Sequence, residues 1–332
     1  MLKPLLRALY WFLFNACRAW GAMRGVRIEP SVQWRGRARF SVGHGSYIGA
    51  RTVLSGDAGA SVQIGERVWM GSDCEISALG RVDIGAHTTL QHRSQLHGDV
   101  RLGAGCTGAA DLYISSGRHE FRRNPPLPIR LQDRARAGLP AAERSQPVEV
   151  GDDCWLGIGV AVMPGVRIGR GCVLGAHSVV TTDLPPYSIA VGSPARVIGQ
   201  RLAYAPPAAL DAARDEHLPY FDAGFSQIGH DEGDAGVPRV AGGLALNRAE
   251  CRIALAVLPG QGVRLQLRAA GPGQLLHAGV VRSVPAGLAT LEWQAAPDAR
   301  GLLSFDWRPE GGAASACLVL LSAQAITLEE QP

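Results

Sequence analysis

Residues 148–198, VEVGDDCWLGIGVAVMPGVRIGRGCVLGAHSVVTTDLPPYSIAVGSPARVI, decide the fold. Within this stretch an aliphatic residue returns every six positions, and the same period runs through residues 42–102 with two short resets. The sixteen positions are Val42, Ile48, Leu54, Ile64, Met70, Ile76, Ile84, Leu90, Leu96, Leu102, Val150, Leu156, Val162, Ile168, Leu174 and Val180. A six-residue period is neither helical nor a two-residue alternation, and a fixed short period is typical of a stacked repeat.

The period predicts a prism of flat six-residue segments, three to a turn, in which each turn buries its core only against its neighbours. The aliphatic residue points inward, and the Gly that often follows it is expected to supply backbone freedom near the corners. A sandwich of short strands would not hold this phase through six consecutive hexads. A slim residue four places after the aliphatic one fills the space beside it: Ser46, Thr52, Val68, Cys74, Thr88, Ser94, Cys106, Cys154, Val160, Cys172 and Ser178.

Length and composition set broad limits. With 332 residues the chain is long enough for two domains, and a net charge of +4 with 19% charged residues is too weak to indicate a nucleic-acid partner. Four of the seven cysteines occupy the slim position, so we expect small core residues and no disulfide framework. This favours a reducing, cytoplasmic location.

Residues 1–25 predict an amphipathic helix, because Leu5, Leu6, Leu9, Phe12 and Leu13 fall on one helical face. The apolar stretch is too short to span a bilayer and lacks a signal-peptide cleavage site. Two interpretations stay open. The helix packs over the open end of the solenoid, or it binds the inner face of the membrane as an interfacial helix.

The rest of the chain divides into further segments. Residues 26–198 are the solenoid, in which residues 118–147 form an inserted polar loop without strands. Residues 199–238 are a linker with a short helix within PPAALDAARDEHLPYF. Residues 239–332 alternate between short apolar segments and Gly or Pro turns, which predicts an antiparallel β-sandwich. This module is either a carbohydrate-binding module or a packing and oligomerisation module.

Two stretches carry a resemblance. LGAGCTGAADLYISSGRHEF, residues 102–121, and the stretch 148–198 resemble the hexapeptide-repeat acyltransferases, which have a left-handed parallel β-helix. They are most similar to the galactoside and maltose O-acetyltransferase branch and to sugar acetyltransferases of surface-polysaccharide assembly. The resemblance implies transfer of acetyl from acetyl-CoA to a hydroxyl of a sugar or sugar-lipid. It also implies a homotrimer with the CoA groove between subunits.

The same resemblance assigns the catalytic residues. His119 matches the family's catalytic histidine, and a neutral imidazole near pH 7 suits removal of the hydroxyl proton as the C–O bond forms. No Ser or Cys nucleophile is needed, because the hydroxyl attacks the thioester directly. Gln91 stands where the family often has Asn, one methylene shorter. The loop after His119 is expected to cover the acceptor.

The resemblance also implies the acetyl-CoA contacts. Trp155 matches a Trp beside the donor channel, and Ile158 and Ala176 match backbone contacts to the pantetheine arm. Thr181 and Thr182 lie where the family commonly has Thr-Lys. Arg196 matches a basic residue that meets the CoA phosphates.

One stretch supports a different hypothesis about function. LQHRSQLHG, residues 90–98, is similar to the metal-ligand stretch of γ-class carbonic anhydrases, with His92 and His97 in the ligand positions. Those enzymes use three histidines, and the sequence offers no convincing third. A metalloprotein of this class and a non-catalytic carbohydrate-binding scaffold remain the alternatives. The leading hypothesis, an O-acetyltransferase, includes no metal site.

Overall fold

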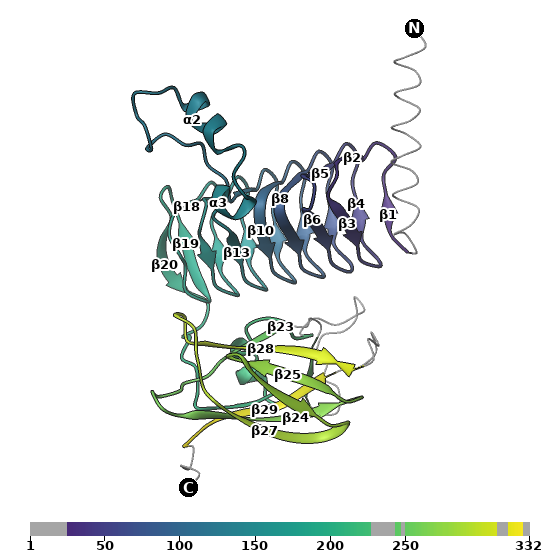
Figure 1. Cartoon of the computed structure of the whole chain (residues 1–332), viewed down its shortest axis with the longest axis vertical. Helices are drawn as coiled ribbons and strands as arrows, with labels where there is room; N and C mark the ends of the chain where they lie inside the picture. The colour runs from purple at the N-terminus through teal and green to yellow at the C-terminus, as the bar shows by residue number, and fades with distance from the viewer. Residues whose placement is uncertain (1–24, 227–242, 247–249, 311–317, 328–332) are drawn as a thin grey trace. The chain divides into compact units, whose positions relative to one another are not determined.

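The computed structural model describes residues 25–226, 243–246, 250–310 and 318–327. The chain divides into two compact units, residues 1–203 and 204–332, which are described separately (Figure 1). The helix predicted for residues 1–25 lies, except for its last residue, outside the described residues. Within the described part of the chain, no helix has the length and apolar character needed to cross a membrane.

The first unit is a stack of coils with three faces. Face 1 contains β1 (Arg27–Ile28), β4 (Tyr47–Ile48), β7 (Trp69–Met70), β9 (Thr89–Leu90), β11 (Thr107–Gly108), β14 (Trp155–Leu156), β17 (Val173–Leu174), β19 (Ser188–Val191) and β20 (Arg196–Gln200). Face 2 contains β2 (Gln33–Gly36), β5 (Val53–Gly56), the first halves of β8 (Glu75–Ile84) and β10 (Gln95–Leu102), β12 (Tyr113–Ser115), β15 (Ala161–Val162) and β18 (Val179–Val180). Face 3 contains β3 (Arg39–Val42), β6 (Ser61–Ile64), the second halves of β8 and β10, β13 (Val148–Val150) and β16 (Arg167–Ile168).

Neighbouring strands on each face are parallel, except that β20 turns back against β19. We call the turn from face 1 to face 2 the first corner, that from face 2 to face 3 the second, and that from face 3 to face 1 the third. The predicted fold class, a parallel β-solenoid followed by antiparallel sheets, is confirmed.

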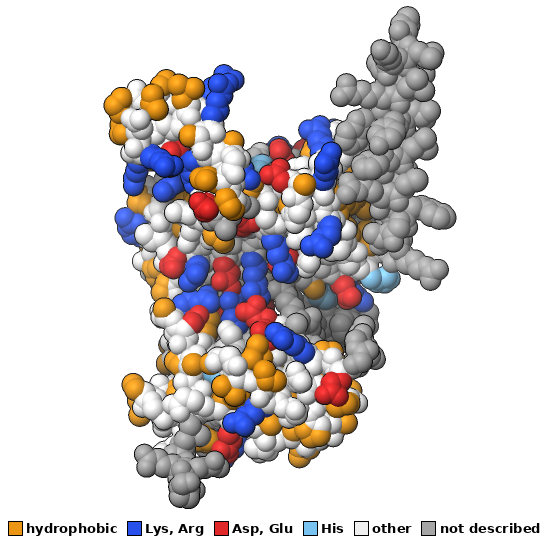
Figure 2. Space-filling view, in the orientation of Figure 1, with side chains coloured by type: hydrophobic (Ala, Val, Ile, Leu, Met, Phe, Trp, Pro, Cys, Tyr) orange, Lys and Arg blue, Asp and Glu red, His pale blue; other side chains and the backbone are white. Residues whose placement is uncertain are grey.

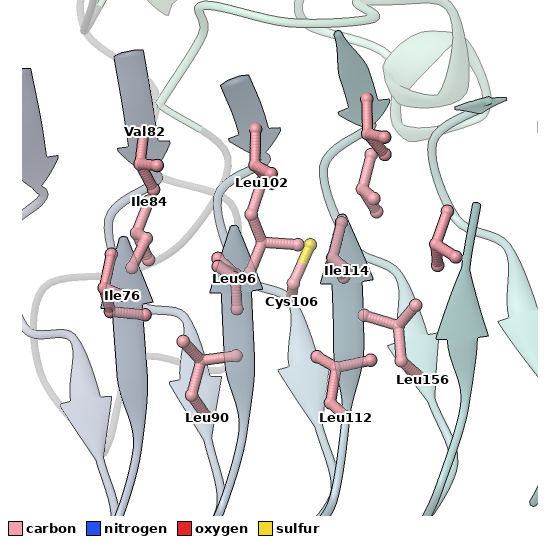
Figure 3. Close-up of a cluster of buried hydrophobic side chains, with 14 of the residues drawn as sticks. Ile76, Val82, Ile84, Leu90, Leu96, Leu102, Cys106, Leu112, Ile114 and Leu156 are labelled. Atoms are coloured by element: carbon pink, nitrogen blue, oxygen red, sulfur yellow. The ribbon is translucent and has the colours of Figure 1, made fainter. Parts of the chain in front are cut away.

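The hexad positions form the interior of the solenoid. Fifteen of the sixteen aliphatic residues are buried, and Val42 is partly buried against the same core. Figure 3 shows Ile76, Leu90, Leu96, Leu102 and Leu156 pointing into this narrow core from β8, β9, β10 and β14. Since each such side chain contributes on the order of 1.5–3 kcal/mol when fully buried, the column of inward residues is the main source of stability.

The slim residues, all eleven of them buried, also join one coil to the next. At the third corner the Thr88 hydroxyl donates to the carbonyl of Gly103 at 2.8 Å, and the thiols of Cys106 and Cys154 donate to the next coil's carbonyl at 3.2 Å. Ser, Thr and Cys therefore combine small volume with a donor for a carbonyl that would otherwise be unpaired. All five described cysteines are free and buried, and burial raises the pKa of the Cys74 thiol to about 11.

The glycines that follow the aliphatic residues have a different role from the one expected. Gly43, Gly85, Gly103 and Gly151 do not have positive φ. A Cβ on Gly103 would lie 2.5 Å from backbone atoms of Gly151 and Asp152 in the next coil. These glycines are needed because adjacent coils approach too closely for a side chain. The left-handed conformation falls two residues later, where non-glycine residues such as His87 and Asp153 adopt it with φ of 59° and 58°.

The solenoid also continues where the hexad pattern lapses after Leu102. Gly108 occupies the aliphatic position of β11, and Leu112 occupies the slim position that follows. A Cβ on Gly108 would lie 2.9 Å from a Leu112 methyl carbon and 3.0 Å from one of Leu90, so the leucines already fill that space. Figure 3 shows Leu90 and Leu112 side by side in the core. In this coil the large and the small residue have exchanged positions, so the volume of side chains in the core is kept.

The insertion leaves the stack at the second corner, between β12 and β13; its first part projects away from the coils, and its last part, before β13, returns to lie against β8 (Figure 1). It contains α2 (Ile129–Arg136) and α3 (Ala141–Arg144), where the sequence predicted a loop. Pro128 and Pro140 precede the two helices as N-caps with φ of −53°. Proline's fixed φ suits the start of a helix, which is why this proline-rich segment contains short helices and no strand.

The second unit contains two antiparallel sheets. One contains β21 (Ala209–Asp211), β22 (Leu244–Ala245), β24 (Gly262–Ala269), β27 (Gly287–Gln294) and β29 (Leu318–Ile326). The other contains β23 (Glu250–Ala254), β25 (Gly273–His277), β26 (Val280–Val284) and β28 (Leu302–Pro309). Their inward side chains, among them Phe305, Trp293 and Trp307, form one core.

Part of the segment predicted as a linker belongs to the β-sandwich. Within PPAALDAARDEHLPYF the structure has β21, paired with β29, and a 3-10 helix, η1 (Asp215–Tyr220), where a linker helix was expected. Phe221 and Phe225 then enter the core of the sandwich. Three prolines and the pairing of Leu210 with Ala323 explain why this segment does not form one regular helix.

Candidate functional site

The base of the insertion is held by a small polar network at the second corner. The buried Ser116 hydroxyl accepts from the backbone N–H of Asp99 at 2.7 Å and lies 2.6 Å from the hydroxyl of Ser145, at the other end of the insertion. The backbone N–H of Gln146 donates to the Ser116 carbonyl at 2.8 Å. The two ends of the insertion are thereby joined to each other and to the preceding coil, which fixes the position of the residues that follow Ser116.

His119 lies three residues after Ser116 and is paired with a carboxylate from α2. Its Nδ1 lies 2.7 Å from Oδ2 of Asp133, while Oδ1 of Asp133 accepts from the backbone N–H of Glu120 at 2.8 Å. Both carboxylate oxygens are therefore occupied, and the helix that carries Asp133 is tied to the segment that carries His119. The His119 side chain is 83% exposed, so its other nitrogen is accessible to a reactant.

This pairing sets the tautomer of the imidazole. The backbone N–H of Glu120, and next the hydrogen bond with His119, hold the pKa of Asp133 below its ordinary value. An ionised carboxylate only accepts hydrogen bonds, so in the neutral ring of His119 the proton is on Nδ1 and Nε2 keeps its lone pair. A lone pair on an exposed Nε2, with a carboxylate behind the ring to stabilise the imidazolium, is the arrangement that a general base needs.

The residues expected at the acetyl donor gather around face 1 and the first corner. Trp155, on β14, is 55% exposed, and Ile158, in the turn after it, is 44% exposed. Ala176 is exposed at the same corner one coil on, where the backbone N–H of His177 donates to the Ile158 carbonyl at 2.8 Å. Arg196, on β20, is exposed and pairs across from Val191, whose side chain packs where a Cβ on Gly175 would lie. These four residues therefore belong to one region.

The remaining predicted residues are less concentrated. Gln91 is exposed at the first corner, two coils before Ile158, but it lies in register with Gly157, one residue ahead of the column that contains Ile158 and Ala176. Thr181 and Thr182 follow β18 and are exposed at the second corner. They lie two coils beyond the start of the insertion, since β12 pairs with β15 and β15 with β18.

His119 and the first-corner column lie at opposite ends of face 2 within one chain. A strand of face 2 separates the two corners, and at about 3.3 Å per residue the five steps from Asp111 to Ser116 span roughly 16 Å. The structure therefore does not bring His119 together with Gln91, Ile158 or Ala176 in a single protomer.

His92 and His97, the candidate metal ligands, have separate hydrogen-bond partners. Nδ1 of His92 accepts from the backbone N–H of Ser72 at 3.0 Å, so in the neutral ring Nε2 carries the proton. Nε2 of His97 lies 3.3 Å from Oε1 of Gln95, and its ring packs 5.8 Å from that of Tyr113. Among the residues that the structure describes, no three His, Cys, Asp or Glu side chains are grouped so that they could hold a metal ion.

Sequence reasoning missed Asp133. It lies fourteen residues after His119, in a segment without periodicity, so no pattern linked the two. One available signal was composition: the insertion holds only three carboxylates, Glu120, Asp133 and Glu143. The sequence therefore offered three candidates within the insertion for a carboxylate that orients the His119 imidazole.

Known proteins match the solenoid. Residues 147–182 match the family model described as bacterial transferase hexapeptide (six repeats). A probable acetyltransferase of Mycobacterium tuberculosis is 32% identical over 206 residues, 59% of this chain, and the chain spans only 63% of that relative's length. The protein of Escherichia coli named "Putative colanic acid biosynthesis acetyltransferase WcaF" is 29% identical over 198 residues, 58% of this chain and 86% of its own.

One solved structure matches part of the chain. A hexapeptide-repeat-containing acetyltransferase of Vibrio cholerae, solved in complex with acetyl coenzyme A, is 23% identical, covers 48% of this chain and 69% of its own, and has a TM-score of 0.27. The family match falls on β13–β18, the coils in which the hexad period is unbroken. The coils that match the hexapeptide family model also have the three-faced geometry that the sequence resemblance predicted for them.

Proposed function

We propose that this protein is an acetyltransferase that moves acetyl from acetyl-CoA to a hydroxyl of a sugar or sugar-lipid, with His119 as the general base. The relatives named as acetyltransferases support the reaction class. The single observation that carries the residue assignment is the His119–Asp133 pair, which is fixed at the base of the insertion and exposes Nε2 to solvent.

The chemistry follows from that pair. Nε2 of His119 removes the acceptor hydroxyl proton while the hydroxyl oxygen attacks the thioester carbonyl. The resulting imidazolium is stabilised by the Asp133 carboxylate and returns the proton to the CoA thiolate as the C–S bond breaks. The products are an O-acetyl ester and CoA with a free thiol, so atoms and charge balance. Backbone N–H groups of a nearby coil would stabilise the oxyanion.

The donor is proposed to bind at the first corner. Trp155 and Ile158 offer exposed apolar surface for the pantetheine arm, Ala176 leaves its backbone accessible, and Arg196 supplies a cation for the CoA phosphates. Thr181 and Thr182, at the second corner, are proposed to reach the same path from the copy that supplies His119. Since His119 lies across face 2 from this column, a complete site needs His119 of one copy beside the first corner of another. A cyclic homotrimer provides such a shared cleft three times.

The acceptor is proposed to be a sugar or a polysaccharide precursor. The Escherichia coli relative is named for colanic acid biosynthesis, which supports a glycan acceptor. Gln91, exposed at the first corner, is proposed to hydrogen-bond the acceptor near the reacting hydroxyl. Because acetyl-CoA is the donor, the proposal includes a cytoplasmic location.

The test measures CoA release from acetyl-CoA in the presence of sugar acceptors. His119→Ala should lower kcat by roughly 10²–10⁴-fold, the usual contribution of a general base. His44→Ala, which removes an exposed histidine elsewhere on the solenoid, is the matched control and should keep full activity. Equal activity in the two variants would remove His119 from the mechanism. No acetyl transfer by the wild-type chain to any sugar tried would count against the reaction itself.

A further inference from the structure

The insertion exposes its apolar side chains and buries a polar one. Every residue from Phe121 to Leu131 is exposed. In α2, Ile129 and Leu131 are 51% and 46% exposed, while Gln132 is only 5% exposed. A helix at a water-facing surface normally has the opposite arrangement, with its apolar residues toward the protein. This inversion indicates that the outer side of the insertion meets something apolar.

The inversion is built into the fold of the insertion. The buried Gln132 amide donates to the carbonyl of Leu127 at 2.9 Å and accepts from the backbone N–H of Asn124 at 3.0 Å. It therefore closes the turn before α2 from the inside. With the polar side chain of Gln132 used in this way, Leu127, Ile129 and Leu131 point outward.

The same surface has unpaired positive charge. Arg122, Arg123, Arg130 and Arg134 are exposed, and in the described part of the chain none has a carboxylate within ion-pair distance. The nearby carboxylates are already engaged: Glu120 lies 3.5 Å from Arg136 and accepts from two backbone N–H groups, and Asp133 holds His119. Figure 2 shows hydrophobic and Arg side chains gathered over α2 and the loop before it.

We propose that this surface docks on an anionic lipid bilayer. We name it the insertion rim, defined by Phe121, Leu127, Ile129, Leu131, Arg122, Arg123, Arg130 and Arg134. Apolar side chains interleaved with Arg are the composition of interfacial segments: the apolar groups enter the boundary of the acyl region and the guanidinium groups meet anionic headgroups. Arg122 already stacks over the Phe121 ring, with its Cζ 5.1 Å from the centroid.

Charge complementarity favours a lipid surface over a second copy of the chain. A partner protein would have to cover the apolar residues and also offer several carboxylates, whereas a copy of this chain has a net charge of +4. The inference stands apart from the proposed reaction and from residues 1–24. Its consequence for function is that His119, at the base of the same insertion, would work close to a membrane, where lipid-linked sugars are held.

The test measures binding of the full-length chain to sedimented vesicles of phosphatidylcholine alone or with about one-third phosphatidylglycerol. Binding should depend on phosphatidylglycerol. Arg122→Gln with Arg123→Gln should weaken it by about 25-fold, taking about fivefold per arginine. Phe121→Ser with Leu131→Ser should weaken it by at least tenfold, because two apolar groups leave the interface. The matched control, Arg37→Gln with Arg39→Gln, removes two exposed arginines of the first coils and should bind as wild type.

Two results would overturn the proposal. The first is anionic-vesicle binding that is absent, or equal in all variants including the control. The second is unchanged vesicle binding by the Phe121→Ser, Leu131→Ser variant together with a loss of oligomer in sedimentation velocity, which would show that the rim packs on a second copy. Circular dichroism and the melting midpoint confirm that each variant is folded, and neither pair of substitutions touches Gln132 or the His119–Asp133 pair.

Discussion

The coil stack and the insertion follow opposite rules within one unit of the chain. In the stack, each position repeats every turn, so an inward Leu, a slim donor and a closely packed Gly recur in fixed order. In the insertion nothing repeats, a glutamine is buried, and leucines are exposed. The repeat therefore supplies a rigid support, while the proposed base, His119, lies where the repeat is interrupted.

Truncating an inward leucine tests the comparison most strongly. Leu156→Ala should lower the free energy of unfolding by about 2–5 kcal/mol, because the narrow core cannot collapse around the lost atoms. Leu131→Ala, the same substitution in the insertion rim, should change it by less than about 0.5 kcal/mol. Denaturant titration followed by circular dichroism measures both. Similar losses in the two variants would mean that the insertion is a structural part of the core.

Adding a methyl group to a glycine sharpens the same contrast. Gly103→Ala should destabilise the chain by about 1–3 kcal/mol, since the new Cβ would lie 2.5 Å from backbone atoms of the next coil. Gly138→Ala is the matched control, because a Cβ there meets no atom within 4 Å. Melting midpoints of the two variants decide the point. An unchanged midpoint for Gly103→Ala would restore the view that these glycines serve only backbone freedom.

The smallest effect concerns Arg93 of the stack, which has a carboxylate partner, and Arg130 of the rim, which has none among the described residues. At the first corner Arg93 meets Asp111 at 2.6 Å, and this hydrogen bond holds the pKa of Asp111 below its ordinary value. A lowered carboxyl pKa contributes stability above the unfolded value of 3.8, and that stability is lost as the pH falls through the lowered pKa.

We therefore expect Asp111→Asn to lower the melting midpoint slightly at neutral pH and to have no effect once the pH is below the lowered pKa. Arg130→Gln, on the rim, is the control and should show no such pH dependence. Melting curves from neutral to strongly acidic pH measure both. A difference between Asp111→Asn and wild type that persists in strong acid would show that the ion pair is not its cause.

Much of the solenoid could be predicted from the sequence, because one constraint repeats. Inward positions of a narrow prism favour aliphatic side chains. The period is therefore repeated at six positions from Val150 to Val180. Where two positions compensate each other, as Gly108 and Leu112 do, the pattern is lost although the volume is kept. The reason for the glycines was also misjudged, since sequence does not show how closely two coils approach.

The candidate site could be predicted only in part. His119 was predicted from a family resemblance at the mouth of the insertion, but its partner Asp133 depends on how a non-repeating segment folds back. The short helices there depend on Pro128 and Pro140 as starting points, and the exposed leucines depend on Gln132 closing the turn from inside. Such single contacts have no periodicity by which a sequence could reveal them.

The most direct test of the central claim, that His119 of one copy serves the first corner of another, is complementation between two inactive variants. His119→Ala lacks the base, and Ala176→Trp places a bulky side chain in the proposed donor path at an exposed position. Each variant alone should be inactive. Co-expressed in equal amounts, they should recover about a quarter of the wild-type CoA-release activity, because one shared site in four would combine an intact His119 with an open corner. A co-expressed mixture that forms mixed oligomers and remains inactive would contradict the account.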